Sequence, residues 1–147
     1  MVKILNIDTS NINEIINIKN LIEIKKPIAC LIHMDGCGFC IELMPIWNKL
    51  SKIFKKNFKG DGYIITINEK VLELSNISIP DLRGYPHIMV FNSLNNNNSI
   101  TTYDEVSRDK NILKQFIVNH LKLKNKKMTK NKNKKRNKYT RKKNKLF

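Results

Sequence analysis

The sequence contains few cysteines and no long apolar run. It is 147 residues long and has three cysteines, too few for the disulfide framework of a small secreted protein. No stretch approaches the roughly 20 apolar residues that a membrane-spanning helix needs. The first residues also lack the apolar core of a secretory signal, so we expect a cytoplasmic protein with no membrane partner.

Acidic residues are missing from the end of the chain. Residues 122–147 contain 14 Lys or Arg and no Asp or Glu, whereas the first 121 residues contain 14 basic and 12 acidic side chains. The net charge of +16 is therefore concentrated in the last segment. We expect a globular domain over residues 1–121 and a disordered basic tail over residues 122–147, because the tail has too few apolar residues to bury a core.

A lysine-rich tail is typical of binding to a polyanion, above all nucleic acid. Each Lys or Arg that contacts a phosphate releases counterions, so binding would be independent of sequence and steeply dependent on salt. The candidate contacts form two clusters, Lys134, Lys135, Arg136 and Arg141, Lys142, Lys143. The same clusters would serve as nuclear targeting signals. A solvated tail without a dedicated partner is the alternative.

The first 121 residues alternate between strand-like and helix-like patterns. Strands are expected over residues 2–7, 27–34, 63–67, 87–91 and 100–103, and helices over 12–26, 37–56, 69–76 and 108–123. The isoleucines of the first helix leave a strand open there. Ser107 is the expected N-cap of the last helix, and residues 92–99 are expected to form a polar turn. This order predicts an α/β fold with a central mixed sheet and helices on both faces.

Cys37 and Cys40 lie where the apolar strand 27–34 gives way to an amphipathic helix. Two thiols three residues apart on the first turn of a helix can close a small disulfide ring, and free backbone N–H groups there favour a thiolate. Such a pair is also half of many zinc sites. Tetrahedral zinc needs four ligands, and the other cysteine and the histidines form no second pair. The pattern therefore favours a redox-active disulfide with no metal and no other cofactor.

With its surroundings, the pair resembles the thioredoxin superfamily, specifically the catalytic domains of protein disulfide isomerases. The residues that carry the resemblance are the pair, Pro45 with Trp47, the segment Arg83-Gly84-Tyr85-Pro86, and the stretch from Tyr103 to Phe116. Asp35-Gly36-Cys37 suggests a glutaredoxin, but Pro45 and the Arg-Gly-Tyr-Pro segment fit the thioredoxin and isomerase branch better. The resemblance implies a three-layer thioredoxin-like fold over residues 1–121.

The resemblance also implies roles for single residues. Cys37 would be the nucleophile that forms a mixed disulfide with a protein substrate, and Cys40 the resolving thiol. Pro86 would be a cis-proline, although X–Pro bonds are usually trans. Tyr85 before it would align an extended substrate peptide, with Gly36 and Phe39 bordering the same surface. The expected partners are proteins with thiols or disulfides and an upstream redox partner, and we expect a monomer.

Several positions depart from the family pattern. Gly36 stands where the family usually has Trp, and Leu31 stands where it commonly buries an acid that moves the proton of the resolving thiol. His33 is a candidate substitute as proton carrier; the alternative is a packed histidine of the core. Phe39 replaces the histidine of isomerases, which removes a cation and predicts a less oxidising couple. Cys30 is expected to be a small core residue.

Composition adds two further hypotheses. The bias toward Asn, Ile and Lys, together with the basic tail, resembles the redox proteins of large AT-rich DNA viruses, for which the host cytoplasm or the virion would be the location. AT-rich protists would show the same bias. The competing functional hypothesis is a redox-inactive interaction or packaging protein that keeps the fold and binds nucleic acid through its tail.

Overall fold

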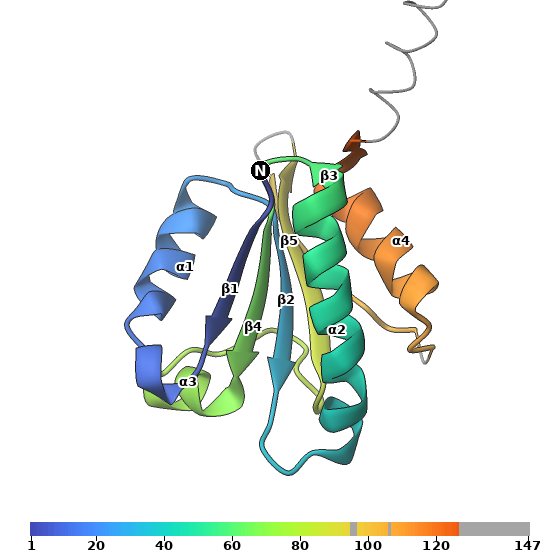
Figure 1. Ribbon diagram of the computed structural model, residues 1–147. Coiled ribbons are helices and arrows are strands. Elements are labelled where there is room, and N and C mark those ends of the chain that lie inside the picture. The colour runs from blue at the N-terminus through green and yellow to red at the C-terminus, as the bar shows by residue number, and fades with distance from the viewer. Residues whose placement is uncertain (95–96, 106, 127–147) are drawn as a thin grey trace, which may run out of the picture.

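A five-stranded mixed sheet runs through the middle of the protein, as the computed structural model in Figure 1 shows. The structure describes residues 1–94, 97–105 and 107–126. In space the strands follow the order β1-β4-β2-β5-β6; the first three are parallel, and β5 and β6 are antiparallel to their neighbours. Their bounds are β1 Lys3–Ile7, β2 Ile28–His33, β4 Tyr63–Asn68, β5 His87–Leu94 and β6 Asn97–Thr102.

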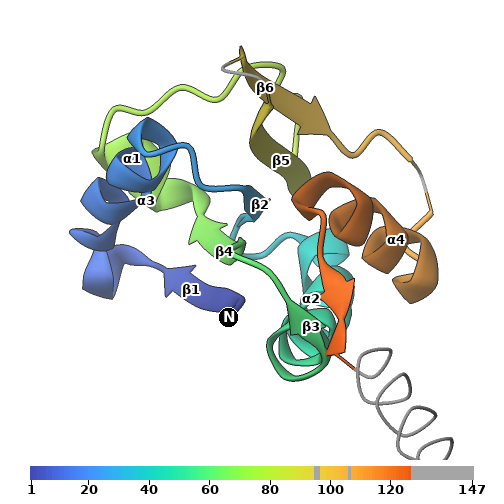
Figure 2. The same ribbon diagram turned by 90° about the horizontal axis from the view of Figure 1, so that it is seen from above.

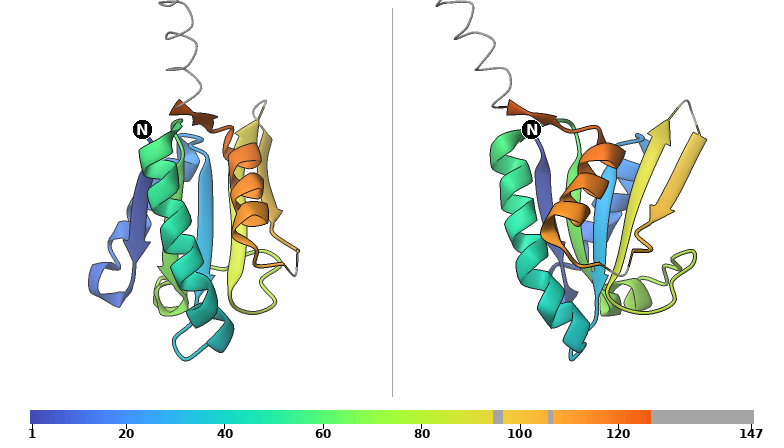
Figure 3. Two further views of the ribbon diagram at one scale, coloured as in Figure 1. Left: turned by 45° about the vertical axis from the view of Figure 1, so that its right-hand side comes forward. Right: turned by 90° about the vertical axis from the view of Figure 1, so that its right-hand side faces the viewer.

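Four α-helices cover the two faces of this sheet in the described part of the chain. Their bounds are α1 Glu14–Glu23, α2 Gly38–Asn57, α3 Glu69–Leu74 and α4 Lys110–Leu121. Helices α1 and α3 pack on one face and α2 and α4 on the other, which the two views of Figure 3 show. The expected three-layer thioredoxin-like α/β fold is confirmed.

Strand β2 contributes side chains to the apolar clusters on both faces of the sheet. Its apolar residues are buried on both faces: Ala29 and Leu31 join the cluster under α2 and α4, whereas Cys30 and Ile32 join the cluster under α1 and α3. Successive side chains of a strand point to opposite faces, so a continuous apolar run suits a strand between two helical layers. The interpretation of Cys30 as a small core residue agrees with this position.

Helix α2 buries one apolar stripe against the sheet. Leu43, Trp47, Leu50 and Phe54 lie on this stripe and are almost fully buried. Trp47 also donates a hydrogen bond from Nε1 to Oγ1 of Thr66 in β4, with a length of 2.9 Å. The helix runs through Pro45 without a break.

Two local predictions are wrong. Residues 92–99 do not form one long turn, because β5 continues to Leu94 and β6 begins at Asn97. The polar residues of this segment have a low strand propensity, but they extend the pairing that begins in the more apolar parts of the two strands. The N-cap of α4 is Asp109, whose carboxylate accepts hydrogen bonds from the backbone of Asn111 and Ile112. Ser107 lies two residues earlier, and its hydroxyl oxygen accepts a hydrogen bond from the backbone N–H of Asp109.

The packed part of the chain extends beyond residue 121, where we placed the domain boundary. After α4, Leu123 is buried in the core, and the short strand β7 (Lys124–Asn125) pairs with β3 (Phe58–Lys59) in a second, two-stranded sheet. Figure 2 shows this sheet at the C-terminal end of α2. Residues 127–147 lie outside the described residues, and the predicted tail clusters lie there with them. In the described chain, each helix is too short or too polar to span a bilayer.

Candidate active site

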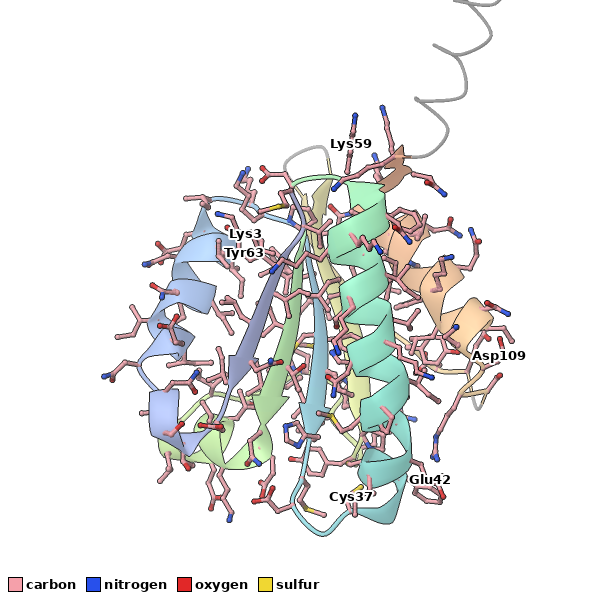
Figure 4. The ribbon with its side chains drawn as sticks, in the orientation of Figure 1. Lys3, Cys37, Glu42, Lys59, Tyr63 and Asp109 are labelled. Atoms are coloured by element: carbon pink, nitrogen blue, oxygen red, sulfur yellow. The ribbon has the colours of Figure 1, made fainter. Side chains whose placement is uncertain are left out.

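Cys37 is the N-cap of α2. Its Sγ accepts a hydrogen bond from the backbone N–H of Cys40, with a length of 3.2 Å, so one of the free N–H groups of the first helical turn points at the sulfur. Figure 4 shows Cys37 at the end of the molecule where the loop after β2 leads into α2. Gly36 before it has φ +74°, a conformation that strains any residue with a side chain. This backbone accounts for glycine at the position where the family usually has tryptophan.

The segment before β5 meets Cys37 from the other side of the site. The Tyr85–Pro86 peptide bond is cis, as the resemblance implies. The Cys37 thiol lies 3.7 Å from the backbone oxygen of Tyr85, to which it donates a hydrogen bond. Both groups sit at one edge of the sheet because β5 starts where the antiparallel β2 ends. The fold therefore brings Tyr85 and Pro86 together with the cysteine pair.

The two thiols have different environments. Cys40 is 2% exposed, and burial, with a smaller effect of Cys37, raises the pKa of its thiol to about 11. Cys37 is partly exposed. The sulfur of Cys37 is thus the one that a substrate can reach, and Cys40 lies behind it. This asymmetry fits a nucleophile followed by a resolving thiol.

Arg108 is a neighbour of the pair that sequence reasoning missed. Its guanidinium carbon lies 4.2 Å from the centre of the Phe39 ring, and its Nη1 bonds Glu42 at 3.1 Å. Its positive charge lowers the pKa of Cys40 and so opposes the effect of burial. The prediction that the Cys37–Cys40 disulfide is less oxidising rested on the loss of a positive charge where Phe39 replaces histidine. Arg108, in the segment before α4, places a positive charge beside Phe39. No local pattern signals this contact, which joins distant parts of the chain.

Leu31 and His33 occupy the strand that leads to the site. Leu31 is fully buried among apolar side chains, so the position where the family buries an acid is filled by hydrocarbon. His33 is half-buried, and burial lowers its pKa while Asp35 and Asp8 oppose that shift. In the described residues, His33 makes no hydrogen bond to either thiol of the pair. Its role as proton carrier stays a prediction.

Two hollows flank Tyr85, Pro86 and Tyr103. The larger has a volume of about 670 Å³ and the smaller one of about 200 Å³. Besides these three residues, the larger is lined by Asp81, Arg83, Gly84, His87, Thr102 and Asp104. The smaller is lined by Leu43, Ile88, Glu105, Arg108 and Leu113. One hollow is therefore polar and the other is apolar with a charged rim, and both border the residues that face Cys37.

Cys30 and His87, two further side chains of metal-binding types, are both buried. Cys30 is buried within the sheet, where burial raises the pKa of its thiol to about 12, a poor thiolate donor. His87 is 7% exposed at the start of β5, and its Nε2 has no hydrogen-bond partner in the part of the chain that the structure describes. Over the same residues, no group of three or more His, Cys, Asp and Glu side chains could hold a metal ion.

Comparison with solved structures finds thioredoxin domains. Similar structures are the J-Trx1 fragment of ERdj5 (TM-score 0.54, 18% identity, 81% of this chain and 52% of that one), zinc-bound human ERp44 (0.50, 21%, 77% and 30%) and the first thioredoxin domain of mouse protein disulfide-isomerase A4 (0.51, 18%, 77% and 73%). The chain spans about half or less of the first structures it matches. No family model and no curated protein matches the sequence. At these identities the likeness shows the thioredoxin fold.

Proposed function

We propose that this thioredoxin-fold protein is a thiol–disulfide oxidoreductase that reduces, forms or isomerises protein disulfides through Cys37 and Cys40. One observation carries the proposal, the position of the Cys37 sulfur. It accepts a hydrogen bond from the backbone N–H of Cys40 and lies 3.7 Å from the carbonyl oxygen of Tyr85, the residue before Pro86. A partly exposed thiol at a helix N-terminus, backed by a buried second thiol, is the arrangement that thiol exchange needs.

In the reductive direction, the Cys37 thiolate attacks one sulfur of a substrate disulfide. A bond forms between the Cys37 sulfur and that sulfur, and the other substrate sulfur leaves as a thiolate. Cys40 then loses its proton and attacks the Cys37 sulfur, which forms the Cys37–Cys40 disulfide and releases the reduced substrate. The protein has given up two electrons, which a dithiol reductant must restore. Oxidation of a substrate dithiol is the same sequence reversed.

The surroundings of the pair suit an extended peptide. The backbone of Tyr85 is positioned to align a substrate in a strand-like pose beside Cys37. The hollows on either side of Pro86 can receive the side chains that flank a substrate cysteine. Phe39 is 59% exposed and offers an apolar contact at the rim, whereas Gly36 offers none. We infer from this that the substrates are unfolded or extended protein segments.

The reduction of insulin disulfides by dithiothreitol tests the proposal. Full-length protein should accelerate the reaction, and the variant Cys37→Ser should not, because it lacks the attacking sulfur. The matched control is Cys30→Ser, which changes the buried thiol that lies outside the site and should keep the acceleration if the variant folds. Activity that survives Cys37→Ser would refute the proposal.

A trapping experiment separates the two thiols. The variant Cys40→Ser retains the attacking sulfur but cannot resolve the mixed disulfide, so it should accumulate a covalent complex with a disulfide-containing peptide. The complex should be visible on a non-reducing gel and disappear on addition of dithiothreitol. A complex that forms with Cys37→Ser and not with Cys40→Ser would mean that the roles of the two cysteines are exchanged.

The competing function is a redox-inactive interaction or packaging protein that binds nucleic acid through residues 122–147. The observation that favours it is the concentration of 14 Lys or Arg in this segment. Retention on DNA-cellulose together with a silent insulin assay would support this function. Three further proposals do not depend on which of the two functions holds. They are a cytoplasmic or nuclear location, a monomeric state and an origin in a large AT-rich DNA virus.

A further inference from the structure

Exposed lysines gather at the end of the molecule opposite Cys37. Figure 4 shows Lys59 and Cys37 at opposite ends of α2. We call this group the basic pole; it consists of Lys55, Lys56, Lys59, Lys122 and Lys124, all of them exposed. They belong to the last turn of α2, to β3, to the C-cap of α4 and to β7, and pairing of the two short strands brings these segments together.

The arrangement of these lysines works against the stability of the small sheet. Lys59 of β3 and Lys124 of β7 are direct partners in the antiparallel register. Like charges directly opposite each other in a strand pair are destabilising. The pair nevertheless stays closed, because Phe58 of β3 and Leu123, which immediately precedes β7, are buried in the core. The fold therefore holds two positive charges side by side on its surface.

Within the described part of the chain, no lysine of the basic pole forms an ion pair with an acidic side chain. The ion pairs in the described residues are Lys26–Asp61, Lys70–Asp35 and Arg108–Glu42, and none includes a lysine of the pole. The nearest acid in the chain, Asp61, is held by Lys26. Lys55 and Lys56 stabilise the C-terminal end of the α2 dipole, which is a sufficient reason for those two. Lys59 and Lys124 belong to strands, so the dipole does not account for them.

We propose that the basic pole is a binding surface for the phosphate backbone of nucleic acid. A polyanion lying across Lys59 and Lys124 would relieve their repulsion and release counterions at the same time. An anionic membrane is the poorer fit, since stable attachment adds inserted apolar groups to the attraction of basic residues, and the apolar side chains of β3 and the adjoining Leu123 are turned into the core. The surface offers cations and no structured reader of bases, so binding is independent of sequence.

The proposed nucleic-acid surface lies far from the proposed site of disulfide exchange. The basic pole and Cys37 lie at opposite ends of α2, a helix of 20 residues, which spans about 30 Å at 1.5 Å per residue. A nucleic acid bound at the pole therefore leaves Cys37, Tyr85 and both hollows accessible. The protein can hold a polyanion and exchange disulfides at once.

The test measures binding of full-length protein to a fluorescein-labelled DNA duplex by anisotropy over a series of salt concentrations. The pole variant carries Lys55→Gln, Lys59→Gln and Lys124→Gln. The matched control carries Lys19→Gln, Lys49→Gln and Lys110→Gln, three exposed lysines away from the pole. Both variants lose the same charge and keep residues 127–147. Thermal unfolding of both variants confirms that they fold.

The pole variant should bind at least about tenfold more weakly at low salt, and its plot of log K against log salt should be shallower by roughly 2.7, or 0.9 for each lost phosphate contact. The control should keep the slope of the unchanged protein. Equal slopes for the two variants would overturn the proposal, as would binding to phosphatidylserine vesicles without binding to DNA. The insulin assay should be the same for all three proteins, so failure here is distinguishable from failure of the proposed redox function.

Discussion

Cys37 and Cys40 are three residues apart and have different surroundings. Cys37 caps α2 and is partly exposed, while Cys40 is buried with a pKa of about 11 for its thiol. At neutral pH such a thiol stays protonated, so resolution of a mixed disulfide requires help with its proton or with its charge. Leu31 offers no proton acceptor, and Arg108 offers a positive charge. A backbone hydrogen bond at Met34 lowers the pKa of Cys40, and Arg108 lowers it to a smaller extent. In the proposed exchange, Arg108 therefore contributes to the second step.

The substitution Arg108→Gln should slow that step. Removing the guanidinium raises the pKa of Cys40 further, and each unit lowers the thiolate fraction at neutral pH tenfold. We expect insulin reduction to fall by a factor of about two to ten at pH 7 and its alkaline limb to move to higher pH. Lys49→Gln, which removes an exposed positive charge of α2 outside both hollows, is the matched control. A similar loss in both variants would show that the effect is not electrostatic.

His87 should make the stability of the protein depend on pH. Burial lowers its pKa from 6.5, and Asp104 and Asp81 oppose that shift only in part. The unfolded chain therefore takes up the proton first, so the free energy of unfolding should fall as pH drops below about 6.5 and level off below the folded pKa. His87→Gln should flatten this dependence in urea unfolding, leaving the part that belongs to His33, whose pKa is also lowered. The same slope in His87→Gln and in unchanged protein would contradict this.

The elements were predicted well where their side-chain pattern is long. The apolar run of β2 and the apolar stripe of α2 predicted both elements to within two residues, because burial imposes a period on the sequence. Two-residue strands impose none, and β3 and β7 were not predicted. The cap of α4 was misplaced by two residues, since Ser107 and Asp109 both have side chains that cap helices.

The stability of the protein should depend on the Asp109 cap of α4. Asp109→Ala removes the acceptor of two backbone N–H groups and should cost about 1 kcal/mol of the free energy of unfolding, within 0.5–2 for such caps. Ser107→Ala removes one bond of 3.2 Å outside the helix and should cost less. Urea unfolding of the two variants measures the difference. A larger loss for Ser107→Ala would restore the cap expected from the sequence.

At the scale of the whole molecule, the chain closes its core with a segment that composition assigned to the tail. Leu123 is 6% exposed and packs in the cluster under α2 and α4, and its side chain lies over Gly60. A lysine precedes and follows it, which made the segment look like the start of a basic tail. The buried side chain of Leu123 and the pairing of β7 with β3 make this segment part of the folded domain.

Shortened chains test this end of the domain. A chain that ends at residue 121 should be less stable than one that ends at residue 126, by about 2–5 kcal/mol, because it loses the buried side chain of Leu123 and the pairing of β7 with β3. Urea unfolding of the two chains gives the difference, and Leu123→Ala in the full-length protein should reproduce most of it. Equal midpoints would place the domain boundary back at residue 121.

The sequence by itself determined the local features of this protein: the buried strand, the amphipathic helix, the cysteine pair between them and the charge asymmetry of the chain. Each depends on neighbours within a few turns of chain, so its signal is contained in a short window. Only the tertiary structure decided that the Tyr85 carbonyl faces Cys37, that Arg108 lies over Phe39 and that Lys59 meets Lys124. These contacts join segments dozens of residues apart, and their geometry follows from the packing of the sheet and its helices.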